Sequence, residues 1–336
     1  MTTMAINGLG RIGRAALKVI LDTPDLELVA VNDIVPIENI VYLLKYDTVY
    51  GRYEKTVEHT GENLIIGGKS YRYYHEKDPS QLPWSNLGVD IVLECTGVFT
   101  KREDLEKHVQ AGAGYVILSA PAKSEDIVTL VHGVNTVDGN THIIACASCT
   151  TNCITPVVEI ISRRIGVKKA IMTTVHAYTA SQAIVDGPSK RFERGRAGAA
   201  NFVPTSTGAA LATARALPQV KGLFDGIAVR GPVTVGSLAD IVLLAERKTT
   251  VEEINQIFLE EAASDRYRGI LGVTEDPIVS GDIIKDPRAS IIDLGMTRVV
   301  DGDLVKVLSW YDNEWGFTNQ MVRTAQQIAQ ASKVMS

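Results

Sequence analysis

The chain has 336 residues, 45% of them hydrophobic and 22% charged, and a formal net charge of −5. These values are ordinary for a globular protein of two domains, and they exclude collagen-like and wholly disordered chains. The acidic balance argues against nucleic acid as the primary partner. The sequence has no apolar run of membrane-spanning length and no secretory signal pattern, and its four cysteines are too few for a disulfide framework. We therefore expect a cytoplasmic protein with no membrane partner.

The first third of the sequence alternates apolar runs with helical patterns. The predicted strands are Ala5–Asn7, Leu26–Asn32, Asp90–Glu94 and Tyr115–Leu118, and the predicted helices are Arg11–Leu21 and Glu103–Ala111. The strands are continuous apolar runs, as expected of strands that are buried on both faces. Repeated strand–helix–strand units predict a parallel sheet with right-handed crossovers.

The rest of the sequence mixes helices with β-rich runs. A helix over Thr151–Ile165 precedes a strand over Lys169–Thr174. The stretch Tyr178–Asn201 then lacks periodicity, and its length is typical of a functional loop. Apolar residues from Phe317 to Ile328 lie on one face of an amphipathic C-terminal helix. Further strands are predicted at Gly226–Val229, Ile241–Glu246, Ser290–Asp293 and Leu304–Tyr311. This mixture predicts a second domain of the α+β class.

The segment Gly8–Gly13 is a complete G-x-G-x-x-G motif. It follows a predicted strand and opens a predicted helix, an arrangement that brings backbone N–H groups onto the pyrophosphate of a dinucleotide. An acidic residue is expected at the end of the second strand to bind a ribose hydroxyl, and Asp33 stands there. Because a carboxylate at this position repels a 2′-phosphate, the motif favours NAD over NADP.

Cys149 lies at the predicted start of a helix, within the sequence ASCTTNC. The positive end of a helix stabilises a thiolate, which is the nucleophilic form of cysteine. Cys146 and Cys149 form a C-x-x-C pair that also fits a redox centre, whereas a zinc site would need a second Cys/His pair that the sequence lacks. Pro156 inside the helical pattern predicts a kink or a later start of the helix.

A nucleophilic thiol needs a base, and the six histidines are the candidates. From Cys149 the predicted helix extends for about 24 Å, and the strand that ends at His176 covers about 23 Å. If this strand returns beside the helix, His176 lies close to Cys149. A thiolate together with a nicotinamide site suggests oxidation of an aldehyde through a thioester. A Cys–His hydrolase, by contrast, would not need a dinucleotide motif.

Eight short stretches of the sequence match one family. They are INGLGRIGR, LLKYDTVYGR, ECTGVF, SAPAK, ASCTTNC, TTVHAYT, NFVPTSTGAA and WYDNEWGF. On these stretches the chain resembles phosphorylating glyceraldehyde-3-phosphate dehydrogenase over essentially its whole length. The resemblance implies reversible conversion of glyceraldehyde 3-phosphate and inorganic phosphate to 1,3-bisphosphoglycerate with NAD, through a cysteine thiohemiacetal and a thioester. It implies no metal.

The resemblance also implies the fold and the assembly. The α/β fold would combine a Rossmann-type parallel sheet with an α+β catalytic domain whose sheet is mainly antiparallel. The dinucleotide-binding domain would comprise residues 1–149 and 316–336, because the C-terminal helix packs back on it, and the catalytic domain residues 150–315. The family forms homotetramers, with the loop Tyr178–Asn201 at the subunit core.

By the same resemblance Cys149 is the nucleophile, and His176 raises its reactivity and acts as the base for hydride transfer. Asp33 would bind the adenosine ribose and Asn313 the nicotinamide carboxamide. The other residues expected at the cofactor are Gly8, Gly10, Arg11, Ile12, Gly13, Thr96, Gly97 and Ser119. Those expected at the substrate phosphate are Thr179 and Arg230, and those at the attacking inorganic phosphate are Ser148, Thr150, Arg194, Thr207 and Gly208.

Three positions depart from the family pattern. Ser181, near the expected substrate-phosphate site, stands where the family usually has Asp, and Gly187 stands where a leucine usually precedes Pro188. Loss of that leucine weakens the steric exclusion of NADP, so the extent to which NADP is accepted stays open. Arg230 is followed by Gly-Pro-Val-Thr-Val-Gly instead of the usual Val-Pro-Thr run. These departures concern cofactor strictness and substrate contacts, and they leave the reaction class unchanged.

Two alternatives stay open at this point. Erythrose-4-phosphate dehydrogenase is a close relative that releases the acid by hydrolysis, and the retained residues Arg194, Thr207 and Gly208 argue for the phosphorylating enzyme instead. A non-catalytic NAD- or RNA-binding protein would not need Cys149 and His176 together.

Overall fold

The computed structural model describes residues 1–138 and 140–335, which cluster into two compact units. The first unit consists of Met1–Leu130, Val137–Ala147 and the chain from Met321 onward. The second consists of Val131–Thr136 and Ser148–Gln320. Each unit has its own sheet and its own hydrophobic core, and no helix in the described ranges is both long and apolar enough to span a membrane.

The first unit is built on a nine-stranded sheet with the order β10-β11-β9-β8-β1-β2-β7-β6-β5. Its strands are β1 (Thr2–Asn7), β2 (Leu26–Asn32), β5 (Val57–Thr60), β6 (Asn63–Ile66), β7 (Lys69–Tyr74), β8 (Ile91–Glu94), β9 (Tyr115–Leu118), β10 (Val128–Thr129) and β11 (Ile143–Ala145). Neighbouring strands from β10 to β7 are parallel, whereas β6 and β5 are antiparallel to their neighbours. The predicted parallel sheet is therefore confirmed.

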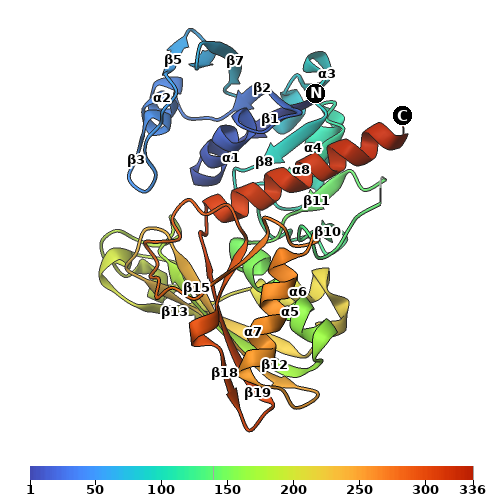
Figure 1. Ribbon diagram of the computed structural model, residues 1–336. Helices are drawn as coiled ribbons and strands as arrows, with labels where there is room; N and C mark the ends of the chain where they lie inside the picture. The colour runs from blue at the N-terminus through green and yellow to red at the C-terminus, as the bar shows by residue number, and fades with distance from the viewer. Residues whose placement is uncertain (139, 336) are drawn as a thin grey trace. The chain divides into compact units, whose positions relative to one another are not determined.

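Helices connect the parallel strands of this sheet. They are α1 (Arg11–Leu21), α2 (Ile37–Lys45), α3 (Trp84–Leu87) and α4 (Arg102–Gln110), and a short ribbon pairs β3 (Tyr46–Asp47) with β4 (Gly51–Arg52). Figure 1 shows α1 alongside β1 and β2, against which it packs. The strand order turns at β1, because β2 pairs with one of its edges and β8 with the other. Ligands of open α/β sheets bind beyond the carboxyl ends of the strands at such a point.

The second unit is built on a mixed sheet with the order β13-β14-β12-β15-β19-β17-β16, and β18 pairs with β19. Its strands are β12 (Val167–Ala177), β13 (Val203–Ser206), β14 (Phe224–Gly231), β15 (Ser237–Ala245), β16 (Leu271–Thr274), β17 (Ser290–Asp293), β18 (Arg298–Val300) and β19 (Leu304–Tyr311). Five of the seven strand pairs in this part of the described chain are antiparallel. The predicted mainly antiparallel sheet is confirmed.

Three helices cover one face of the second sheet: α5 (Cys149–Arg164), α6 (Ala209–Ala216) and α7 (Val251–Ala263). Figure 1 shows them gathered against this side of the strands. Their apolar side chains form a core with the inward faces of β12, β15 and β19, around fully buried Phe258 and Tyr267. The last helix, α8 (Trp315–Met335), closes the described chain.

Of the two outcomes predicted for Pro156, a kink or a later start of the helix, the later start is wrong. Helix α5 begins at Cys149 and continues through Pro156 to Arg164. The reason lies at its N-terminus, where Ser148 is extended (φ −121°, ψ 167°) and its Oγ accepts a hydrogen bond from the N–H of Thr151 at 3.2 Å. This cap satisfies an N–H group that has no partner inside the helix, and so fixes the helix start at Cys149.

Candidate active site

The glycine motif forms a compact turn between β1 and α1. Gly8 adopts φ +92°, and a Cβ built on it would lie 2.6 Å from the backbone nitrogen of Thr96. A Cβ on Gly13 would collide with the carbonyl oxygen of Gly8. Gly10 precedes α1 without a side-chain cap, and the first turn of α1 contains no acidic residue. The turn therefore leaves room for a phosphate group at the positive end of the helix.

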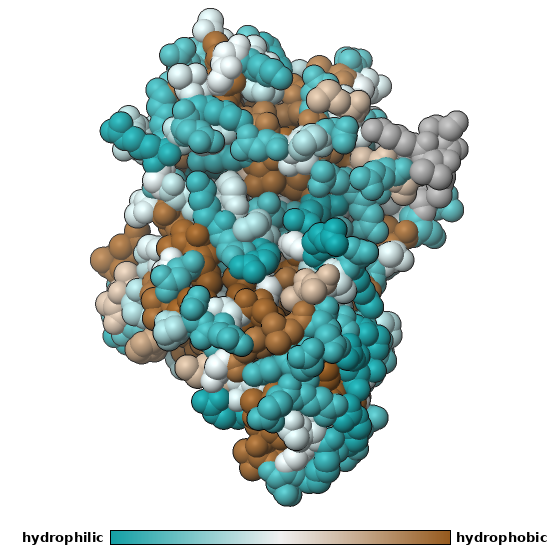
Figure 2. Space-filling view, viewed as in Figure 1, coloured by the Kyte–Doolittle hydropathy of each residue, from teal (hydrophilic) through white to brown (hydrophobic). Residues whose placement is uncertain are grey.

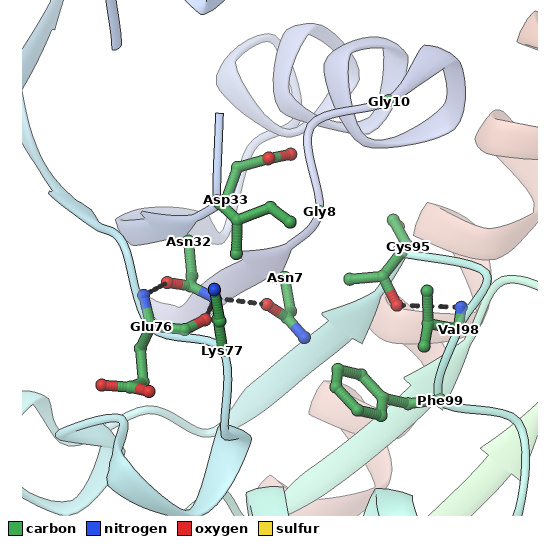
Figure 3. Close-up of a pocket in the computed structure, with 12 residues that line it drawn as sticks. Asn7, Gly8, Gly10, Asn32, Asp33, Glu76, Lys77, Cys95, Val98 and Phe99 are labelled. Atoms are coloured by element: carbon green, nitrogen blue, oxygen red, sulfur yellow. Dashed lines mark hydrogen bonds between the residues drawn. The ribbon is translucent and has the colours of Figure 1, made fainter. Parts of the chain in front are cut away.

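A pocket of about 390 Å³ opens beside this turn. Figure 3 shows the residues around it, with Gly8 and Gly10 leading into α1. Its lining comprises Asn7, Gly8, Gly10, Asn32, Asp33, Ile34, Glu76, Lys77, Cys95, Thr96, Val98 and Phe99. Four residues expected at the cofactor are among them, namely Gly8, Gly10, Asp33 and Thr96. The pocket lies at the carboxyl ends of β1, β2, β7 and β8, as expected at the turning point of the sheet.

Asp33 follows β2 and lines this pocket. One carboxylate oxygen accepts a hydrogen bond from the N–H of Leu9 at 2.5 Å, and the other accepts one from the N–H of Val35 at 3.0 Å. The carboxylate is thus fixed against the glycine turn, where it both shapes the turn and presents negative charge to the pocket. A turn with no room for a side chain at Gly8 or Gly13, together with an anchored carboxylate, fits the phosphate and ribose groups of a dinucleotide.

The other residues expected at the cofactor lie outside the pocket lining. Arg11 forms an ion pair with Asp47, with 2.6 Å between Nη1 and Oδ2, and its guanidinium lies over the ring of Tyr50. Ile12 and Gly13 belong to the first turn of α1, and Gly97 adopts φ +71° in the loop after β8. Ser119 follows β9, and its side chain contacts the thiol of Cys95.

Cys149 and His176 meet in the second unit. Cys149 is the first residue of α5, and His176 is the penultimate residue of β12. The Sγ atom of Cys149 lies 3.3 Å from Nε2 of His176. The strand therefore returns beside the helix and brings the histidine back to the helix N-terminus. This pair can transfer a proton between sulfur and nitrogen.

The second ring nitrogen of His176 has two fixed partners. Nη1 of Arg230 lies 2.5 Å from Nδ1, and the carbonyl oxygen of Ala177 lies 2.7 Å from it. A guanidinium only donates and a carbonyl only accepts, so Nδ1 has a suitable partner whether or not it carries a proton. The ring can thus take a proton from the thiol at Nε2 while it stays in place.

Burial dominates the proton affinities of this pair. It raises the pKa of the Cys149 thiol, and the charge of Arg230 and hydrogen bonds from Thr150 oppose this effect. Burial, assisted by Arg230, lowers the pKa of His176 to about 3. His176 is therefore a neutral imidazole at neutral pH, which is the form that can act as a base.

The residues expected at phosphate groups belong to the same unit as the pair. Arg230 stands beside His176, and its buried Nε has no hydrogen-bond partner within the described residues. The Nε of Arg194 donates to Thr205 Oγ1 at 3.1 Å. Neither arginine forms an ion pair with an acidic residue of the described ranges, so both remain available to an anion.

Hydroxyl and amide groups complete this set. Thr207 and Gly208 immediately precede α6, and Gly208 is its N-cap residue. Ser148 caps α5, and the Oγ1 of Thr150 lies 4.0 Å from the sulfur of Cys149. The Oγ1 of Thr179 contacts the hydroxyl of Ser181 at 2.8 Å. Two helix N-termini and several hydroxyl groups are the donors that phosphate oxygens prefer.

Asn313 follows β19 and is also part of the second unit. Its Oδ1 accepts hydrogen bonds from the N–H of Gly236 at 3.1 Å and from the hydroxyl of Ser237 at 2.9 Å. The amide oxygen is thus fixed, and the amide NH₂ is the part of the side chain that can donate to a carboxamide.

The sequence analysis did not identify Tyr311, which packs against His176 and bonds to Thr150, the residue next to Cys149. Its side chain is 1% exposed, and its hydroxyl lies 2.9 Å from Thr150 Oγ1 and 2.7 Å from Thr174 Oγ1. Its ring packs edge-on against His176, with 5.9 Å between the ring centroids. The sequence pattern does not indicate this supporting role, because a tyrosine at the end of an apolar strand is equally typical of an ordinary core residue.

Cys146 and Cys153 are buried free thiols, and Cys95 is a partly buried one. Burial raises the pKa of Cys146 and of Cys153 to about 12. Cys146 contacts the hydroxyl of Thr324, and Cys153 lies 3.3 Å from Ser309 Oγ. High thiol pKa values disfavour the thiolate that a redox centre or a metal site requires. Within the ranges 1–138 and 140–335, no cluster of His, Cys, Asp and Glu side chains could hold a metal ion.

A dinucleotide-binding sheet and a cysteine–histidine pair beside an arginine fit the class of aldehyde-oxidising dehydrogenases. Comparison with known proteins agrees with this class. Residues 148–313 match the model of the glyceraldehyde 3-phosphate dehydrogenase C-terminal domain, and residues 2–102 match the model of its NAD-binding domain. The chain belongs to the glyceraldehyde-3-phosphate dehydrogenase family, and its cofactor is NAD.

Similar curated relatives carry the same name. The chain is 48% identical over 323 residues to the glyceraldehyde-3-phosphate dehydrogenase of Streptomyces coelicolor, which covers 95% of this chain and 96% of the relative. It is 45% identical over 340 residues to the enzyme of Clostridium pasteurianum, covering 99% and 100%. For the enzyme of Geobacillus stearothermophilus the identity is 47% over 329 residues, covering 97% and 98%.

Proposed function

We propose that the chain catalyses the reversible oxidative phosphorylation of glyceraldehyde 3-phosphate to 1,3-bisphosphoglycerate. The single observation that carries this proposal is the position of Cys149 Sγ, 3.3 Å from His176 Nε2, with Arg230 at the other ring nitrogen. A nucleophile, a base and an anion-binding cation thus occupy one site in a chain of the glyceraldehyde-3-phosphate dehydrogenase family.

NAD, when bound, supplies the acceptor for the two electrons of the aldehyde C–H bond. The residues that would hold it in the first unit are the glycine turn Gly8–Gly13 with Asp33 and Thr96, supported by Arg11, Gly97 and Ser119. Asn313 in the second unit would bind the carboxamide through its NH₂ group. The glycine turn supports this assignment, because a Cβ at Gly8 would fill the space against Thr96.

The chemistry of the chain itself begins at Cys149. His176 accepts the thiol proton at Nε2, the sulfur adds to the aldehyde carbon, and the imidazolium then gives this proton to the carbonyl oxygen to form a thiohemiacetal. The imidazole then takes the hydroxyl proton as the C–H bond breaks, which leaves a thioester on Cys149. Because burial keeps the free imidazole neutral, His176 returns to its basic form after each proton leaves.

Inorganic phosphate completes the reaction by attack on the thioester carbonyl. A phosphate oxygen forms the acyl–phosphate bond, the carbon–sulfur bond breaks, and the thiolate of Cys149 is regenerated. We assign this phosphate to Ser148, Thr150, Arg194, Thr207 and Gly208, and the phosphate of the substrate to Thr179 and Arg230. The N-termini of α5 and α6 and the unpaired Nε of Arg230 support these assignments.

The erythrose-4-phosphate alternative is not favoured, because the relatives named above are glyceraldehyde-3-phosphate dehydrogenases. A non-catalytic binding protein would not need the Cys149–His176 pair. We place the enzyme in the cytoplasm, which cell fractionation with an antibody to the chain would test.

We also propose a homotetramer, as the family resemblance implies. One face of the second sheet carries exposed apolar side chains, including Ile171 (59% exposed) on β12 and Ile227 (52% exposed) on β14. The loop before β13 adds Phe192, Ile184 and Val185, which are 89%, 88% and 74% exposed. Figure 2 shows apolar surface on this unit around the position of β13 and β15 in Figure 1. Apolar area of this kind favours burial against further copies of the chain. Light scattering on the purified protein tests the number of copies.

The test of the proposed function is the initial rate of NADH formation with glyceraldehyde 3-phosphate or erythrose 4-phosphate, with and without inorganic phosphate. Strong phosphate dependence with glyceraldehyde 3-phosphate supports the proposal. Phosphate-independent oxidation that prefers erythrose 4-phosphate would contradict it, and with it the roles given to Arg194 and Thr207.

A further inference from the structure

A buried carboxylate that the reaction does not use lies beneath the NAD pocket. Glu94 is the last residue of β8, and its side chain is fully buried. No lysine or arginine of the described ranges pairs with it, and its only ion-pair partner there is His108 on α4, also fully buried. A carboxylate buried without a cation is costly unless hydrogen-bond donors surround it. Its position therefore calls for an explanation.

Four donors converge on this carboxylate from three segments. Oε2 accepts from Asn7 Nδ2 at 2.6 Å and lies 3.1 Å from His108 Nε2. Oε1 accepts from the N–H of Thr96 at 2.8 Å and from the hydroxyl of the same residue. Asn7 immediately precedes the glycine turn, and Thr96 belongs to the loop after β8. One carboxylate thus ties together two loops that line the pocket.

Trp84 fixes the direction of the hydrogen bond from His108. Its indole Nε1 lies 3.0 Å from Nδ1 of His108, and an indole nitrogen only donates. Nδ1 of the histidine is therefore the acceptor, which leaves its single proton on Nε2, directed at Glu94. His108 does not line the pocket, but it contacts Glu94, and its Nε2 lies 3.4 Å from Nδ2 of Asn7, which does line it.

The network continues to the remaining pocket loops. Asn32 Nδ2 donates to Asn7 Oδ1 at 2.7 Å. The same side chain donates to the carbonyl oxygen of Glu76 at 2.9 Å, and its Oδ1 accepts from the N–H of Glu76 at 2.8 Å. Figure 3 shows these bonds linking Asn7, Asn32 and Glu76 along the floor of the pocket. The loops after β1, β2, β7 and β8 therefore share one continuous hydrogen-bond chain.

We propose that Glu94 and His108 are positioning residues for NAD, which hold the glycine turn and the Thr96 loop in the separation that the cofactor requires. This inference rests on the proposed placement of NAD in the first unit. Neither residue contacts the cofactor or the reacting atoms. Preorganised loops lower the conformational cost of binding, so loss of the network weakens NAD affinity and leaves the chemical step unchanged.

The experiment measures the dissociation constant of NAD by calorimetry on the full-length protein, below the unfolding temperature of each variant. Glu94→Gln replaces one acceptor by a donor, and we expect its affinity for NAD to fall by about tenfold or more, because charge-assisted bonds are lost. His108→Leu removes the Nε2–H donor and leaves the Trp84 indole without its partner, and we expect a similar fall in the affinity for NAD. His108→Gln retains a donor and should bind NAD within about threefold of the native protein, in line with a retained hydrogen bond.

Leu105→Ala is the matched control. Leu105 is fully buried on the same helix as His108, but it belongs to the apolar core. This variant should lower the unfolding temperature and leave NAD affinity unchanged. In Glu94→Gln and His108→Leu the KM for NAD should rise, while kcat at saturating NAD and the rate of Cys149 alkylation stay as in the native protein.

The inference is overturned if folded His108→Leu binds NAD as tightly as the native protein, or if Leu105→Ala weakens binding equally. Asp33→Ala separates this failure from failure of the proposed site. If Asp33→Ala weakens NAD binding and the Glu94 and His108 variants do not, only the positioning role falls. If none of them changes the affinity, NAD does not bind in this pocket.

Discussion

Arg230 and His176 are register partners on the parallel strands β14 and β12, and Nη1 of the arginine lies 2.5 Å from Nδ1 of the imidazole. The guanidinium thus faces the ring nitrogen that points away from Cys149. Its positive charge stabilises the thiolate of Cys149 and disfavours a proton on His176, and both effects lower the corresponding pKa values. The sheet register therefore sets the electrostatics of the reactive pair.

Removal of the Arg230 charge should raise the pKa of Cys149. The guanidinium lowers this pKa, so in Arg230→Leu the thiolate forms only at higher pH, and the rate of alkylation by iodoacetamide should rise at higher pH than in the native protein. The KM for glyceraldehyde 3-phosphate should rise as well. Arg196→Leu, at an arginine of the loop before β13 that forms an ion pair with Asp186, is the control. An unchanged alkylation profile in Arg230→Leu would contradict the electrostatic role.

Loss of the base should slow the reaction strongly. His176→Asn removes the proton acceptor that lies 3.3 Å from the sulfur. General-base catalysis contributes about 10²–10⁴-fold, so we expect kcat to fall by that factor while NAD affinity stays unchanged. Steady-state rates together with a calorimetric NAD titration check both parts. A variant that retains more than half of the native kcat would exclude His176 as the base.

The four cysteines should differ sharply in reactivity. Cys149 is half-buried at a helix N-terminus, whereas Cys146 and Cys153 are buried and their pKa values are raised to about 12. Substoichiometric iodoacetamide at neutral pH should label Cys149 first, as peptide mass spectrometry would show. Cys149→Ala should lose this fast labelling and keep NAD binding. Earlier labelling of Cys146 would revive the redox interpretation.

Asp33 should contribute to the choice between NAD and NADP. Its carboxylate lines the pocket and repels a 2′-phosphate, so Asp33→Ala should reduce the ratio of kcat/KM for NAD to kcat/KM for NADP. Gly187→Leu restores the residue that the family usually has before Pro188 and should raise the same ratio. If the ratio in Asp33→Ala equals that of the native protein, discrimination does not depend on this carboxylate.

The hydroxyl of Tyr311 should stabilise the fold. It is buried between the hydroxyls of Thr150 and Thr174, so Tyr311→Phe leaves both without this partner. One such bond contributes about 1 kcal/mol, which thermal or urea unfolding resolves. Tyr42→Phe, at a residue that is 61% exposed, should cost nothing measurable. Equal stability of the two variants would show that the Tyr311 hydroxyl does not stabilise the fold.

The sequence predicts well those features that rest on local patterns. The elements Arg11–Leu21, Leu26–Asn32 and Tyr115–Leu118 have the predicted bounds, since each is a periodic or continuous apolar run. The strands β5 and β6 have no counterpart in the prediction, because they are short and half-exposed and so resemble loop. Helix α5 begins earlier than Pro156 suggests, since the cap at Ser148 outweighs the missing N–H of the proline.

The site follows the same division. The similar lengths of the predicted helix and strand allow His176 to lie close to Cys149 if the strand returns beside the helix. The structure places Nε2 of His176 3.3 Å from Sγ of Cys149. The bond between Arg230 and His176 depends on the pairing of β12 with β14, which the sequence does not specify. The network of Glu94 and His108 likewise depends on contacts between residues 14 and more positions apart. Long-range register and buried polar contacts are therefore where the structure adds most.

The most direct test of the proposed mechanism is detection of the thioester between the substrate and Cys149. The protein is mixed with glyceraldehyde 3-phosphate and NAD without inorganic phosphate, quenched in acid and analysed by mass spectrometry of its peptides. The proposed mechanism predicts that the acyl group of the substrate is bound to Cys149 as a thioester and is removed when inorganic phosphate is added before the quench. The absence of an adduct on Cys149, or an adduct that phosphate does not remove, would contradict this mechanism.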